Sequence, residues 1–134
     1  MSAEKPMILI VDDEPAIRSA LRRILKHLGF QVVEAGGAAE AFGLLDAGGQ
    51  IPDGAILDYM MPQVGGVELA RRLRDRHPEL PVLILSGGVL DAELEGALDE
   101  GLLWAYVPKP WDLHWIREAV PRMVAGETAP PLPD

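Results

Sequence analysis

ILIVDDEPAIR, residues 8–18, is the most informative stretch of the chain for its architecture. A short apolar run stops at three acidic residues, and Pro15 then suits the opening turn of a helix. The apolar run is continuous rather than alternating, which is typical of a strand covered on both faces of a parallel sheet. Apolar residues with helical spacing follow as far as Leu28, and Gly29 suits the exit of the helix. The stretch therefore predicts a buried strand followed by an amphipathic helix.

Four more apolar runs of strand length follow along the chain. They occupy residues 31–35, 54–57, 82–85 and 103–107. Helical patterns lie between and after them, at residues 38–47, 68–77, 91–100 and 113–124. Pro121 lies inside the last pattern and predicts a kink or a local break there. Five strands alternating with five helices predict right-handed βαβ units and a doubly wound α/β sheet.

Length and composition favour one globular domain with an ordinary core. The chain has 134 residues, of which 49% are hydrophobic and 25% charged, so an intrinsically disordered chain does not fit. A net charge of −9 argues against general binding to a nucleic-acid backbone. The absence of cysteine excludes disulfide frameworks and thiol chemistry.

The apolar runs also bear on location and on the chain ends. None approaches the ~20 residues of a spanning helix, and the first is shorter than the ~7 to 15 residues of a signal-peptide core. We therefore expect a cytoplasmic protein with no membrane association. The folded unit is expected to span residues 5–125. Residues 126–134 contain three prolines and predict an extended, frayed tail or a linker stub.

Polar residues stand at the carboxyl ends of four predicted strands, where chemistry collects in such sheets. These residues are Asp12 and Asp13, Asp58, Ser86, and Lys109. Converging carboxylates repel one another, and a divalent cation relieves that repulsion. Oxygen ligands without His or Cys favour Mg²⁺. Beside such an ion, Asp58 is the best-placed nucleophile toward a phosphoryl group, with Lys109 and Ser86 contacting the phosphoryl oxygens.

Each of these residues also has a purely structural interpretation. Asp12 and Asp13 suit a helix N-terminus as capping residues. Asp58 and Ser86 suit turns or ordinary loops, and Lys109, between two prolines, suits a solvated loop. Taken one at a time, the structural interpretations are favoured. The joint placement at one edge favours the functional interpretation.

Four motifs together make the chain resemble the response-regulator receiver domains of two-component signalling, in the CheY-like superfamily. They are ILIVDDEPAIR at 8–18, AILDYMMPQVGG at 55–66, PVLILSG at 81–87 and YVPKPW at 106–111. The resemblance runs from about residue 7 to about residue 124. It implies a flavodoxin-like fold with strand order 2-1-3-4-5, for which a member of this superfamily is itself a standard example.

The resemblance also implies a role for individual residues. Asp58 matches the phosphoacceptor, and Asp12 and Asp13 match the acidic pair that helps to hold Mg²⁺. Met60 would add a backbone carbonyl to the metal. Ser86 and Lys109 match the residues that contact the phosphoryl group, and the Lys109–Pro110 peptide is expected to be cis.

A conformational switch and a partner surface are implied as well. Ser86 would move toward the phosphate while Tyr106, the aromatic of the fifth strand, turns inward. The alternative for Tyr106 is plain core packing. Trp104, Trp111 and Trp115 all fall within the implied output face, which suggests a partner site, although packing at the edge of the core explains them equally well.

The implied partners are proteins. The phosphoryl donor would be a histidine kinase or a phosphotransfer protein that docks on the first helix, where Arg18 and Arg22 are candidate contacts. A downstream protein target, or a second copy through the fourth helix, fifth strand and fifth helix, would read the output. No DNA-binding segment follows residue 124, so the chain is expected to lack an output domain or to be part of a longer protein.

Other functions fit the residues less well. The switch is not primarily an enzyme, because it assists only its own phosphorylation and dephosphorylation. An aspartate-nucleophile phosphatase typically has a second acid two residues after its nucleophile, where this chain has Met60. A flavodoxin-like cofactor carrier would need a phosphate-binding loop where Asp12, Asp13 and Glu14 stand. A degenerate receiver that acts only as a binding module would not need the complete set of pocket residues.

Overall fold

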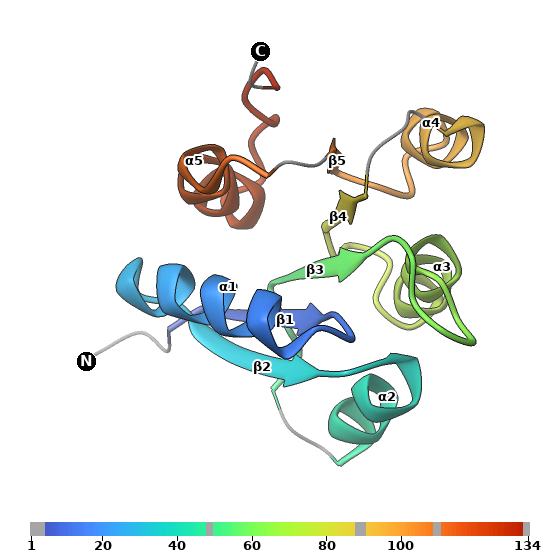
Figure 1. The fold of residues 1–134 in the computed structure, drawn as a ribbon, viewed down its shortest axis with the longest axis horizontal. Helices are drawn as coiled ribbons and strands as arrows, with labels where there is room; N and C mark the ends of the chain where they lie inside the picture. The colour runs from blue at the N-terminus through green and yellow to red at the C-terminus, as the bar shows by residue number, and fades with distance from the viewer. Residues whose placement is uncertain (1–4, 48–49, 88–90, 109–110, 133–134) are drawn as a thin grey trace.

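A computed structural model describes residues 5–47, 50–87, 91–108 and 111–132. Five strands alternate with five helices, as the sequence predicts (Figure 1). In chain order they are β1 (Met7–Val11), α1 (Pro15–His27), β2 (Gln31–Ala35), α2 (Ala38–Asp46), β3 (Gly54–Asp58), α3 (Gly66–Arg76), β4 (Val82–Ser86), α4 (Ala92–Asp99), β5 (Ala105–Pro108) and α5 (Leu113–Val124).

The strands form one parallel sheet in the order β2-β1-β3-β4-β5, which confirms the flavodoxin-like topology. The central strands β1, β3 and β4 are almost completely buried, whereas the edge strands β2 and β5 are partly exposed. This difference explains why the apolar runs of the central strands are the clearest in the sequence.

Helices cover both faces of the sheet and make two core layers. Helices α1 and α5 lie on one face, and α2, α3 and α4 lie on the other (Figure 1). Alternate residues of a strand point into opposite layers, so Leu9 belongs to the α2–α4 layer while Ile8 and Ile10 belong to the α1–α5 layer. Helices therefore pack against the sheet on both faces, and this packing fixes the positions of the residues at its carboxyl edge.

Local sequence signals set both ends of α1 and the end of α3. Pro15 is at the first turn of α1, and Gly29 follows the helix with a φ of 96° that favours glycine. Helix α3 stops at Arg76 because Pro78 disfavours helical backbone at His77, whose φ is −133°.

The predicted break at Pro121 does not occur. Helix α5 continues from Leu113 to Val124 with Pro121 inside it. The proline lies in the last turn on the exposed side of the helix, and Ala125 still donates to the Pro121 carbonyl at 3.0 Å. One missing N–H so near the end disturbs few of the helix hydrogen bonds.

Candidate functional site

Strand register brings four of the predicted site residues to one edge of the sheet. Asp58 is the last residue of β3 and pairs in register with Leu85 of β4, so Ser86 stands one position beyond it. Val11, the last residue of β1, pairs with Leu57, so Asp12 and Asp13 begin the loop beside Asp58. Residues distant in sequence therefore meet at the carboxyl edge, as expected for this topology.

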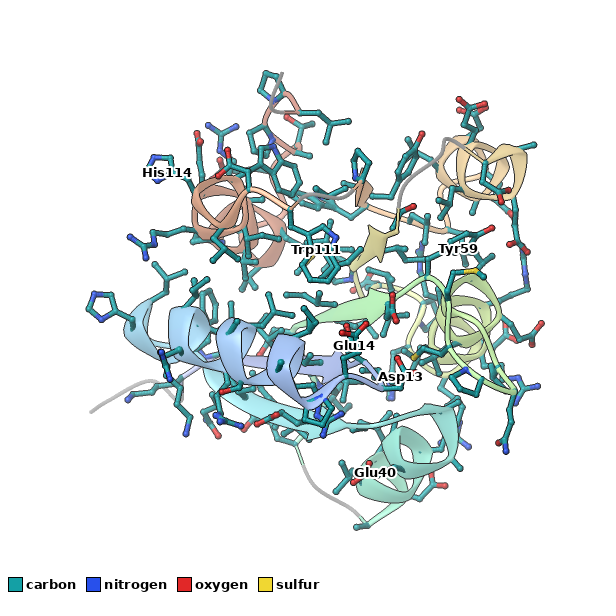
Figure 2. The ribbon with its side chains drawn as sticks, in the orientation of Figure 1. Asp13, Glu14, Glu40, Tyr59, Trp111 and His114 are labelled. Carbon is teal, nitrogen blue, oxygen red and sulfur yellow. The ribbon has the colours of Figure 1, made fainter. Side chains whose placement is uncertain are left out.

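Three carboxylates converge at that edge. One carboxylate oxygen from each of Asp12, Asp13 and Asp58 lies within 4.8 Å of the others. Asp12 is buried, Asp58 is half-buried and Asp13 is exposed. The cluster therefore opens to solvent on one side, and Figure 2 shows Asp13 in the loop beyond the end of β1. A small hard cation would fit this all-oxygen donor set.

The buried Asp12 is fixed by its own loop. Its backbone N–H donates to the Ala35 carbonyl at 3.1 Å, and its Oδ1 accepts the Glu14 N–H at 2.8 Å. Arg18 Nη1 donates to the Asp12 backbone carbonyl at 2.5 Å. The N-cap of α1 is Glu14, with no side-chain capping bond, so the interpretation of Asp12 as a helix cap is wrong.

Arg18 and Arg22 both reach toward Glu34 of β2. Arg22 Nη1 lies 2.5 Å from Glu34 Oε2, and Arg18 Nε lies 3.6 Å from Oε1. Their guanidinium groups are thus already paired within the chain. Docking of a kinase on these two residues stays a prediction, and Arg18 has a second role in supporting the Asp12 loop.

Gly66 is a further residue of the site, and it was not among the residues predicted from the sequence. A Cβ built there would lie 2.5 Å from the Asp58 carbonyl oxygen and 3.0 Å from the Tyr59 Cα, so only glycine lets α3 approach the end of β3 this closely. The Gly66 N–H donates to the Tyr59 carbonyl at 2.9 Å. The sequence feature that could have indicated this role is the pair Gly65-Gly66, which ends the motif at 55–66.

Tyr59, next to Asp58, was also missed. Its hydroxyl donates to carboxylate oxygens of Asp91 at 2.7 Å and Glu93 at 2.9 Å, which joins the loop after β3 to the start of α4. Figure 2 shows Tyr59 in the region between α3 and α4. Burial and the two carboxylates raise the pKa of Tyr59 above its ordinary value. Its bond lowers the pKa of Asp91.

The remaining predicted site residues occupy different surroundings. Ser86 is buried at the end of β4, and Met60 is the most exposed large apolar residue near the site, at 71%. Tyr106 is half-buried on β5 and packs against the α2–α4 layer. Burial raises its pKa, and the charges of Glu95 and Asp99 on α4 raise it further. Lys109 and the Lys109–Pro110 peptide lie outside the described residues.

All three tryptophans face the α1–α5 layer. Trp115 is only 5% exposed, and Trp104 and Trp111 are half-buried. Figure 2 shows Trp111 between α5 and the sheet. Their role as a partner surface stays a prediction, and Trp115 is covered in this structure.

A family model for the response regulator receiver domain matches residues 8–121. The chain belongs to this family. The response regulator MprA of Mycolicibacterium vanbaalenii is 37% identical over 130 residues, which cover 91% of this chain and 55% of that protein. The chain therefore spans about half the length of the curated relatives it matches.

Solved receiver structures agree with the fold. A response regulator receiver protein from Pseudomonas putida has a TM-score of 0.75 and 31% identity, covering 94% of this chain and 100% of that one. TrrA from Thermotoga maritima, solved in complex with Mg²⁺-BeF, has a TM-score of 0.72 and 28% identity. The match covers 88% of this chain and 98% of TrrA. In the receiver's described residues, no helix combines the length and apolar character needed to cross a bilayer.

Proposed function

We propose that this receiver is a phosphorylation-activated signalling switch that accepts a phosphoryl group on Asp58. The donor is a histidine kinase or a phosphotransfer protein, and the reaction depends on Mg²⁺. The observation that carries the proposal is the convergence of Asp12, Asp13 and Asp58 within 4.8 Å at an edge open to solvent.

Magnesium suits the donor set. Asp12, Asp13 and Asp58 would hold the ion, with the backbone carbonyl of Met60 as a further oxygen ligand. Three carboxylates without an adjacent histidine favour a hard cation over zinc. When bound, Mg²⁺ neutralises charge on the phosphoryl oxygens. The structure with Mg²⁺-BeF was solved for the relative from T. maritima, and it supports the same ion here.

The chain's own residues perform the transfer. A carboxylate oxygen of Asp58 attacks phosphorus, the bond between phosphorus and the donor histidine nitrogen breaks, and an aspartyl phosphate forms. The Ser86 hydroxyl donates to a phosphoryl oxygen, and the Lys109 ammonium pairs with another. Gly66 and the buried Asp12 fix the geometry, so positioning and charge neutralisation supply most of the catalysis.

The phosphoryl group then biases two conformations of the protein. Contact with Ser86 draws the β4–α4 connection toward Asp58, and Tyr106 turns into the space that is left. The altered surface of α4, β5 and α5 binds a downstream protein or a second copy of the chain. The protein acts in the cytoplasm, where ATP-dependent kinases supply the phosphoryl group, and it is not itself an enzyme beyond this self-directed chemistry.

The decisive experiment is phosphorylation by acetyl phosphate with Mg²⁺, followed by intact mass spectrometry. We expect one base-labile adduct of about 80 mass units, the size of one phosphoryl group, in the wild type and none in Asp58→Asn. Asp75→Asn, which alters an exposed aspartate of α3, is the matched control and should be modified like the wild type. An adduct that persists in Asp58→Asn, or that forms equally in EDTA, would contradict the proposal. No adduct in any variant would favour a degenerate receiver.

A further inference from the structure

Residues 126–132, here called the tail segment, are fastened to the body of the receiver. The sequence predicts that they fray, but the structure has them folded back beside α5, on the opposite side of the molecule from α2 (Figure 1). The Glu127 N–H donates to the Arg122 carbonyl at 2.9 Å and closes the turn after α5. Whether a longer linker follows stays a prediction.

Two indoles hold the tail segment by its backbone. Trp104 Nε1 donates to the Glu127 carbonyl and Trp115 Nε1 to the Pro131 carbonyl, both at 2.8 Å. Trp104 precedes β5, and Trp115 lies in the first turn of α5. The two tryptophans, here called the tryptophan pair, therefore anchor two carbonyls of the tail segment that are four residues apart.

Apolar contact completes the attachment. Ala129 packs against the α1–α5 core layer, and Pro130 is buried. Thr128 and Leu132 are exposed, so the tail segment presents one side to the protein and the other to water. The protein therefore contacts the tail segment through its backbone carbonyls and its small apolar side chains.

The prolines of the tail segment suit binding through backbone carbonyls. Proline has a fixed φ and no N–H, and it restricts the preceding residue to extended backbone. A segment with consecutive prolines therefore loses little entropy on binding and offers carbonyls as its main polar groups. Aromatic surfaces that recognise proline-rich peptides exploit these properties. The tryptophan pair supplies aromatic rings together with N–H donors.

We propose that the tryptophan pair is a binding site for an extended proline-containing peptide, filled in this chain by its own tail segment. Its indole donors lie on α5 and just before β5, outside the cluster of Asp12, Asp13 and Asp58. A proline-containing segment from another protein reaches Trp115 only by displacing the tail segment, which has the advantage of an effective concentration of about millimolar because it is tethered.

The test uses the full chain and does not use a phosphodonor. Ala129→Glu places a charge in the apolar contact and should release the tail segment, whereas Thr128→Glu places the same charge on the exposed side and should not. A fluorescent peptide with the sequence of residues 126–134 is added, and its anisotropy is measured. We expect binding to Ala129→Glu at least about 10-fold tighter than to the wild type or to Thr128→Glu, since the tethered tail competes in both.

Two further binding measurements test whether the indole donor and the prolines are responsible for peptide binding. Trp104→Phe keeps a ring but removes the donor, and in the Ala129→Glu background it should weaken peptide binding by about 10-fold. A peptide with its prolines replaced by glycine should bind more weakly still. If circular dichroism shows that Ala129→Glu does not fold, the double variant Pro130→Gly, Pro131→Gly replaces it. Equal binding to all variants, or no binding to the released chain, overturns the proposal.

Discussion

Gly66 lets α3 approach the end of β3, beside Asp58, closely. Because an added Cβ would meet the Asp58 carbonyl at 2.5 Å, Gly66→Ala must displace backbone at the end of β3. We expect a loss of about 1–3 kcal/mol in the free energy of unfolding, the range for overpacking, together with slower phosphorylation. Urea denaturation and acetyl phosphate labelling measure the two effects.

Gly43→Ala is the matched control for that change. Gly43 lies inside α2 with nothing within 4 Å of an added Cβ, so alanine should stabilise the helix by about 1 kcal/mol. If both substitutions had the same effect, close packing at Gly66 would not be what constrains Asp58.

The Tyr59 hydroxyl should make stability depend on pH. Tyr59→Phe removes the bonds to Asp91 and Glu93 and should lower the free energy of unfolding by about 1 kcal/mol near neutral pH. The folded pKa of Tyr59 is raised, so its contribution is complete below the ordinary value near 10 and declines as the pH rises above it. The folded pKa of Asp91 is lowered, so its contribution is lost as the pH falls below 3.8.

Urea denaturation of both proteins between pH 3 and pH 11 tests this dependence. The difference in stability between wild type and Tyr59→Phe should be largest in the middle of the range and smaller at both ends. A difference that is constant with pH would show that ionisation of the Tyr59 hydroxyl and of Asp91 does not contribute to the effect.

The connection after β4 offers a test at the level of an element. Gly87 follows Ser86, and in this structure an added Cβ there would meet nothing within 4 Å. Its φ is not in the left-handed region, so Gly87→Ala should raise the free energy of unfolding by about 0.4–1 kcal/mol through the unfolded state. Thermal denaturation of the wild type and of Gly87→Ala measures this change in stability. Gly101→Ala, at a φ of 81°, should instead destabilise by about 1 kcal/mol.

The sequence predicted the elements well where a local signal exists. Continuous apolar runs located the buried strands, and Pro15 and Gly29 marked the ends of α1. The docked tail could not be predicted, because proline content indicates an extended chain but not its partner. The bonds to Trp104 and Trp115 span 23 and 16 residues and depend on the tertiary fold.

The site was predictable for a similar reason. Parallel strands bring their carboxyl ends together, so Asp12, Asp13 and Asp58 could be grouped before their positions were known. The hydrogen bonds from Tyr59 to Asp91 and Glu93 were not predictable, because the sequence around Tyr59 does not indicate which helix it contacts. Gly66 stands in the glycine pair that ends the motif at 55–66, but its requirement for glycine follows from a distance of 2.5 Å that only the fold shows.

Across the whole molecule, a net charge of −9 adds to the repulsion among the three clustered carboxylates. Mg²⁺ that binds only the folded chain should therefore raise its stability, by about 1.4 kcal/mol at about ten times the dissociation constant. Asp12→Asn should remove this magnesium-dependent gain. It should also stabilise the metal-free chain, because one repelling charge is gone. Thermal denaturation with EDTA and with Mg²⁺ measures both effects.

Asp75→Asn separates binding at the cluster from general screening of charge. It removes one negative charge from α3 but leaves the three clustered carboxylates in place, so its magnesium-dependent gain should equal that of the wild type. Screening by salt acts on every exposed charge and would stabilise all three proteins alike. An equal gain in Asp12→Asn would therefore place the effect on the overall charge and remove the support for a magnesium site at Asp12, Asp13 and Asp58.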